Sequence, residues 1–164
     1  MYETMRKEVA FSPWGEVTLL PRYHTAREEE RVVGPEVPIE GLDPTQFELT
    51  NCFRTSEHVT GWELQRRAVE ELHSPYGRHY ATYLERKVHF EPYPQPFLPQ
   101  EWKRYTIMFL GDYDLDDLTC DGYRPCAFCL HYDDFRWLLG TLRLDAYYSD
   151  VSNSHLRVLT PRST

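Results

Sequence analysis

The segment Arg104–Leu110 constrains the fold of this chain more than any other stretch of its sequence. It reads Arg-Tyr-Thr-Ile-Met-Phe-Leu, so a strand here would carry Tyr, Ile and Phe on one face and Met and Leu on the other. A strand that is apolar on both faces is typical of the interior of a sheet that is covered on both sides. We therefore predict a central, covered strand, which the rest of the chain must flank.

The best-defined helix start in the sequence lies at Thr60. Thr60 and Glu63 match the Thr-x-x-Glu pattern of a capping box. Val59 and Leu64 occupy the two positions of a hydrophobic staple, which fixes the direction in which the chain enters a helix. The helix is predicted to end near Ser74-Pro75, because the residue before a proline avoids the helical conformation.

Alternation of apolar and polar residues predicts a strand over residues 46–54. Residues 15–23, 144–148 and 155–159 are predicted as further short strands. Residues 80–90 are compatible with a helix or a strand, and a strand is preferred for their second half. A second helix is predicted to begin at Asp133 or Asp134 and to continue to Leu142, because apolar residues recur there at helical spacing. The Asp-rich residues 111–118 are predicted to form a loop. The elements together predict one globular domain over residues 1–164 with an α+β fold, a single layer of mixed, mostly antiparallel sheet with two to four helices packed on it.

Charge and composition limit the classes of partner and the compartment. The chain has 164 residues, a net charge of -8 and twelve tyrosines. The negative charge disfavours nucleic acid as the main partner, because acidic flanks repel a phosphate backbone. No apolar run is long enough to span a membrane, and the N-terminus lacks the apolar core of a signal peptide, so we expect an intracellular protein. Its cysteines are then expected to be thiols or metal ligands, not disulfides.

Three of the four cysteines lie within ten residues. Cys120, Cys126 and Cys129, together with His131, offer three thiolates and an imidazole, a ligand set that a tetrahedral zinc ion accepts. The spacing Cys126-x-x-Cys129 is that of a zinc knuckle, in which both sulfurs reach one ion. The alternative is that these residues are buried or partly exposed free thiols. The sequence leaves both interpretations open.

A second pattern reaches upstream to His89-Phe90-Glu91. Together with Pro125-Cys126-Ala127-Phe128-Cys129, it resembles the His-x-Glu and Pro-Cys-x-x-Cys motifs of the zinc-dependent cytidine and nucleobase deaminases, over residues 89–148. The resemblance implies that His89, Cys126 and Cys129 bind zinc and that Glu91 transfers the proton of the zinc-bound water. In the competing interpretation, Glu91 is only the last polar residue before a run of prolines.

We expect a non-enzymatic binding protein of the accessory, inhibitor or immunity type, with a zinc-dependent deaminase as the alternative. Its predicted contact surface is acidic and rich in tyrosine, a residue that combines a large apolar area with a polar group. The residues of this surface are Asp112, Tyr113, Asp114, Asp116, Asp117 and Tyr123. Opposite charge accelerates association, so the expected partner is a protein with a basic surface.

Overall fold

The structure is a computed structural model that describes residues 8–12, 15–19, 43–89, 96–119 and 122–163; for residues 8–12, 15–19, 115–119, 122 and 123 it describes the backbone alone. Its strands are β1 (Glu8–Ser12), β2 (Gly15–Leu19), β3 (Phe47–Thr50), β4 (His58–Thr60), β5 (Thr106–Thr119), β6 (Gly122–Asp133), β7 (Arg136–Arg143), β8 (Tyr147–Ser149) and β9 (Leu156–Pro161). Its α-helices are α2 (Gly61–Arg66) and α3 (Arg78–His89). Shorter helical turns are η2 (Pro44–Gln46), η3 (Arg67–Glu71) and η4 (Gln100–Arg104).

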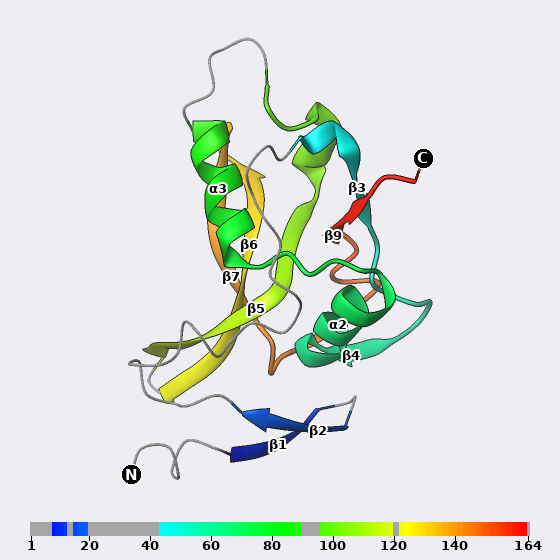
Figure 1. The fold of residues 1–164 in the computed structure, drawn as a ribbon, viewed down its shortest axis with the longest axis vertical. Helices are drawn as coiled ribbons and strands as arrows, with labels where there is room; N and C mark the ends of the chain where they lie inside the picture. The colour runs from blue at the N-terminus through cyan, green and yellow to red at the C-terminus, as the bar shows by residue number, and fades with distance from the viewer. Residues whose placement is uncertain (1–7, 13–14, 20–42, 90–95, 120–121, 164) are drawn as a thin grey trace.

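A five-stranded sheet in the order β3-β9-β5-β6-β7 forms the centre of the molecule (Figure 1). β5 and β9 are parallel, and the other neighbours are antiparallel. β5 lies in the middle, and its residues Ile107, Met108, Phe109 and Leu110 are all buried. The predicted central strand and the predicted α+β class with a mixed sheet are therefore confirmed. Two smaller two-stranded sheets, β1-β2 and β4-β8, complete the topology of the described residues.

Helices cover both faces of the five-stranded sheet. On one face α3 packs over β6 and β7, and its Leu84 shares a buried core with Phe109 and other strand residues (Figure 1). On the other face Leu64 of α2 lies in a second core with Met108 of β5. Neighbouring residues of β5 thus contribute to opposite cores, as the pleat of a strand requires. No described helix is long and apolar enough to cross a membrane.

Residues 136–143 form strand β7, so the helix predicted from Asp133 to Leu142 is wrong. β7 pairs with β6 without a register shift, from Asp133 opposite Arg136 to Cys126 opposite Arg143. The chain reverses at Asp134-Phe135, directly after β6, and this reversal places the backbone of 136–143 alongside β6, where it pairs as a strand. Apolar residues at helical spacing do not show this, because pairing with a neighbouring strand is a tertiary contact.

The segment 78–89 is helical throughout, so the strand predicted for the second half of residues 80–90 is wrong. Tyr80, Ala81 and Leu84 are the buried residues of α3, and their spacing of three to four positions places them on one face of a helix. That face covers the sheet. The tertiary contact that decides between helix and strand here is the core that this face shares with Phe109 of β5 and Leu130 of β6.

The predicted helix start at Thr60 is confirmed. Thr60 Oγ1 accepts a hydrogen bond from the backbone N–H of Glu63 at 3.2 Å, and Val59 and Leu64 belong to the same core. The α-helix ends at Arg66 and passes into the π-helical turn Arg67–Glu71, a few residues before the predicted end at Ser74-Pro75. The strands predicted near residues 46–54 and 155–159 are present as β3 and β9.

Candidate functional site

The two cysteines of the Cys-x-x-Cys pattern lie on a strand. Cys126 and Cys129 both belong to β6, and both are buried. β6 pairs regularly with β7 over these residues, and side chains three positions apart on a regular strand point to opposite faces. A zinc knuckle places a turn between its two cysteines, whereas this structure has a regularly paired strand there. Among the described residues, no three His, Cys, Asp or Glu side chains form a group that could hold a metal.

Cys129 and His131 share one face of β6 and flank Gly140 of β7. A Cβ at Gly140 would lie 3.4 Å from Cys129 Sγ and 3.4 Å from His131 Cε1. Burial raises the pKa of the Cys129 thiol to about 11, so this thiol is protonated at neutral pH and is not a ready nucleophile. Cys120 lies outside the described residues. A zinc site that includes Cys120 stays a prediction.

The two motifs of the deaminase resemblance lie on different elements. His89 is the last residue of α3 and is exposed, whereas Cys126 and Cys129 are buried in β6. His89, Cys126 and Cys129 do not form a group that could hold a metal in the part of the chain that the structure describes. Glu91, the predicted proton carrier, lies outside the described residues.

Two members of the predicted acidic surface are buried, so this part of the prediction is wrong. Asp112 Oδ1 accepts a hydrogen bond from the backbone N–H of Arg78 at 2.9 Å, at the start of α3, and burial raises the pKa of Asp112. The ring of Tyr113 meets Trp62 edge to face at 5.2 Å. Asp114 lies 3.7 Å from the Arg78 guanidinium. The other three residues of the predicted surface, Asp116, Asp117 and Tyr123, have side chains that the structure does not describe.

The Asp-rich segment 111–118 belongs to β5, so the predicted loop is wrong as well. The pairing of β5 with β6 shifts between Phe109 and Asp114, which is the mark of a β-bulge. Gly111 lies in the bulge, where a Cβ would come within 1.9 Å of the Pro75 carbonyl oxygen. The bulge lets the chain at Pro75 cross β5 closely, and it turns Asp112 toward the start of α3.

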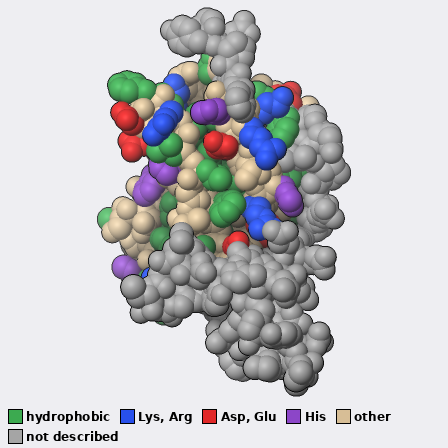
Figure 2. Space-filling model, turned by 90° about the vertical axis from the view of Figure 1, so that its left-hand side faces the viewer, with side chains coloured by type: hydrophobic (Ala, Val, Ile, Leu, Met, Phe, Trp, Pro, Cys, Tyr) green, Lys and Arg blue, Asp and Glu red, His purple; other side chains and the backbone are tan. Residues whose placement is uncertain are grey.

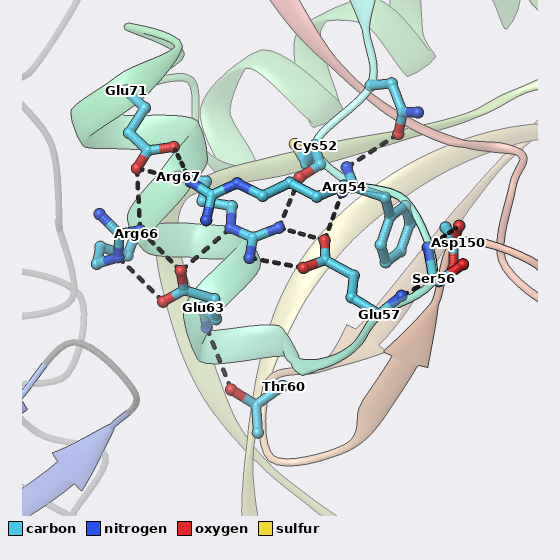
Figure 3. A network of polar contacts seen from close by, with 12 residues as sticks. Cys52, Arg54, Ser56, Glu57, Thr60, Glu63, Arg66, Arg67, Glu71 and Asp150 are labelled. Carbon is cyan, nitrogen blue, oxygen red and sulfur yellow. Dashed lines mark hydrogen bonds and ion pairs between the residues drawn. The ribbon is translucent and has the colours of Figure 1, made fainter.

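A network of ion pairs around Arg67 is the most extensive polar cluster of the described residues (Figure 3). The Arg67 side chain is 5% exposed, and it donates to Glu57 Oε2 at 3.0 Å, to Glu63 Oε1 at 3.1 Å and to the Cys52 carbonyl at 3.0 Å. The hydrogen bond from Arg67 lowers the pKa of Glu57, and the one from Arg66 lowers the pKa of Glu63. The network joins the loop before β4 to the helical turn behind it. Its charges satisfy one another, so it is a structural cluster and not a ligand site.

The turn between β6 and β7 exposes an aromatic side chain. Phe135 is 90% exposed, and both Asp134 and Phe135 have positive φ angles, 49° and 65°. Two central residues with positive φ are the requirement of a type I′ hairpin turn, in which Asn and Gly are preferred. A bulky residue in this left-handed region is an outlier that costs stability. The hairpin therefore holds a large apolar side chain in water on a strained backbone.

Two clusters of cations and aromatic rings, which meet in the chain at residues 103 and 104, adjoin this turn, and we call them together the cation–aromatic ridge. The ring of Tyr132 lies 5.5 Å from that of Trp137, edge to face, and Lys103 Nζ lies 4.5 Å from the centre of the Tyr132 ring. Beside Lys103 in the sequence, the ring of Tyr105 is contacted by two guanidinium groups. The members of the cation–aromatic ridge are Lys103, Arg104, Tyr105, Tyr132, Trp137 and Arg157.

The described Lys and Arg side chains fall into two groups. Those that form ion pairs with carboxylates are Arg54, Arg66, Arg67, Arg78, Arg124 and Arg143. Those without a carboxylate partner among the described residues include the three cations of the ridge. Figure 2 looks onto the side of the molecule that carries α3 and β7, and on its upper part Lys and Arg side chains lie beside hydrophobic ones. Positive charge and half-buried aromatic rings thus occur together in the ridge, on a protein that is acidic as a whole.

The sequence interpretation missed Phe135 and the ridge. It placed Phe135 on the buried stripe of a helix that does not exist. A signal was nevertheless available, because Phe135 stands between Asp133-Asp134 and Arg136, and charged residues on both sides are typical of a surface turn. Arg157 could not be associated with Tyr105 by any local pattern, since the two residues meet only through the pairing of β9 with β5.

Comparison of the chain with models of protein families finds no match, and comparisons with curated proteins and with solved structures find none either.

Proposed function

We propose that the protein is a binding protein, of the accessory or inhibitor type, that contacts another protein through the tip of the β6–β7 hairpin and the adjoining cation–aromatic ridge. The observation that carries this proposal is Phe135, which is 90% exposed and has a φ of 65°. Its side chain contributes no burial to the fold, and its backbone costs stability. A partner that buries the ring would supply the missing burial of the side chain and offset the free-energy cost of the backbone conformation.

The residue types around the hairpin are those of protein interfaces. Binding energy concentrates in aromatic and Arg side chains, with polar residues around them that exclude water. Trp137 and Tyr132 lie beside the tip as partly buried aromatic residues. Exposed Asp134 and Arg136 flank Phe135 in the chain. This arrangement supports a contact with Phe135 at its centre and charged residues at its rim.

The proposal moves the contact surface away from the acidic stretch of β5. Asp112 and Tyr113 are buried, and Asp114 lies beside Arg78, so they do not present the exposed acidic and tyrosine-rich surface that the sequence predicted. The proposal keeps the function predicted from the sequence, which is binding of another protein. It places the contact surface at the β6–β7 hairpin instead of on β5.

Affinity capture from the cells that express the protein tests the proposal. Wild-type protein, Phe135→Gly and Val151→Gly are immobilised, and the captured proteins are identified by mass spectrometry. Val151 is a matched control, because it is 80% exposed but does not lie on the hairpin. We expect a partner that wild type and Val151→Gly capture and Phe135→Gly does not. With the purified partner, loss of a central aromatic contact of at least about 2 kcal/mol would raise Kd about 30-fold.

Two results would refute the proposal. One is capture of the same proteins by wild type and Phe135→Gly. The other is a purified partner whose Kd is the same for both, which would show that the hairpin tip lies outside the interface.

A further inference from the structure

Tyr105 lies against two guanidinium groups that have no carboxylate partner among the residues the structure describes. The guanidinium carbon of Arg104 lies 5.0 Å from the centre of the Tyr105 ring, and that of Arg157 lies 4.6 Å from it. Arg104 is exposed and Arg157 is half-buried. Among the described residues, neither arginine forms an ion pair, whereas the exposed Arg54 and Arg143 both do. The two positive charges repel each other in the unbound protein, although each is also attracted to the ring. The arrangement suits a site where a partner supplies a carboxylate.

Arg157 is held in position before any partner arrives. Its Nη1 donates to the carbonyl oxygens of Ser154 and Leu156, at 2.5 Å and 2.8 Å, which fixes one edge of the guanidinium. The remaining N–H groups make no hydrogen bond to a described residue, so they stay available to an acceptor. An arginine that is ordered in advance loses less conformational entropy on binding. Its planar donor edge also matches the two oxygens of a carboxylate.

The charges beside the ridge indicate which class of macromolecule supplies the anion. Glu101 on η4 and Asp133 and Asp134 at the hairpin are exposed, and they lie along the chain beside Lys103, Arg104 and Tyr132. A nucleic acid carries phosphates at regular short intervals, so acidic residues interspersed among the cations would repel it. A protein partner can place carboxylates opposite the arginines and other groups opposite the acidic residues. The rings of Tyr105 and Tyr132 are also already stacked with cations, which leaves less ring surface for nucleobases.

We propose that Arg104 and Arg157, held against Tyr105, form a carboxylate-binding subsite for an acidic segment of the protein partner. This inference rests on the proposed function and adds the chemistry of the partner to it. The partner is expected to offer Asp or Glu side chains next to an apolar pocket for Phe135. Its acidic character is the opposite of the basic partner that the sequence predicted.

A fluorescein-labelled peptide of ten glutamates tests the subsite without knowledge of the partner. Fluorescence anisotropy is measured at low salt and again at raised salt, with a ten-residue oligothymidylate of the same label as the nucleic-acid probe. The proteins are wild type, Arg104→Gln/Arg157→Gln and Arg54→Gln/Arg143→Gln. The last variant is the matched control, because it loses the same two charges from arginines that are exposed but paired with carboxylates. We expect at least tenfold weaker peptide binding in the first variant and less than twofold change in the control.

Three results would overturn the subsite. They are no binding of the glutamate peptide by wild type, an equal loss in both double variants, and tighter binding of oligothymidylate that depends on Arg104 and Arg157. Because Arg157 also bonds to the turn before β9, Arg104→Gln alone, at an exposed position, repeats the test if the double variant does not fold. A negative result with the peptide, together with a partner whose capture requires Phe135, would overturn the subsite and leave the proposed function standing.

Discussion

Replacing Phe135 with glycine should make the protein more stable while it weakens binding of the partner. The Phe135 side chain is 90% exposed, so its removal costs almost no buried area, and its φ of 65° becomes unstrained in glycine. Relief of the left-handed conformation is worth about 1–2 kcal/mol. The greater freedom of glycine in the unfolded chain offsets about 0.5–1 kcal/mol of this gain. We therefore expect a net increase of about 0.5–1 kcal/mol in the free energy of unfolding, or about 1–4 °C in Tm for a chain of this size.

The same substitution at Val151 isolates the backbone effect. Val151 is 80% exposed and does not have a positive φ, so Val151→Gly carries the unfolded-state cost without the relief. The two variants should then differ by about 1–2 kcal/mol, which is the left-handed penalty itself. Urea denaturation of wild type and both variants at equal m value measures this difference. If Phe135→Gly is destabilised as much as Val151→Gly, Phe135 makes contacts that stabilise the fold, and our reason for assigning it to a partner fails.

Three further predictions concern the interior. Arg67→Met should lower the free energy of unfolding by about 3–5 kcal/mol, because it leaves Glu57 without its buried partner. The control Arg54→Met, at an exposed ion pair, should lower it by less than about 1 kcal/mol. Equal losses for the two variants in urea denaturation would contradict a special role for the network. Burial raises the pKa of Asp112, so the folded state holds this proton more tightly, and the stability that it contributes falls as pH rises from the ordinary pKa of 3.8 through the raised one. Asp112→Asn should remove that fall, and a difference in stability from wild type that stays constant with pH would contradict it. If Cys120 completes a zinc site, metal analysis should show that at most one of Cys126→Ser and Cys129→Ser loses zinc, and loss in both would contradict their opposite orientation.

Local patterns in the sequence were sufficient where a residue's neighbours along the chain decide its conformation. The cap at Thr60 is such a case, because its hydroxyl and the N–H of Glu63 lie in the same helical turn. The central strand is another, since Ile107 to Leu110 are apolar on both faces and no arrangement other than burial on both sides removes them from water. These features determined the α+β class and the place of β5 in it.

Contacts between distant segments decided the rest. Residues 136–143 carry a helical pattern, yet they pair with β6 because the turn at Asp134-Phe135 brings them alongside it. Asp112 looks like a surface carboxylate in the sequence, but the bulge in β5 directs it to the start of α3. Arg157 reaches Tyr105 only because β9 lies parallel to β5. The sequence determined that β5 would be buried on both faces, and the tertiary structure decided which charges and rings lie together at the surface, because that depends on the order of strands in the sheet and not on the order of residues in the chain.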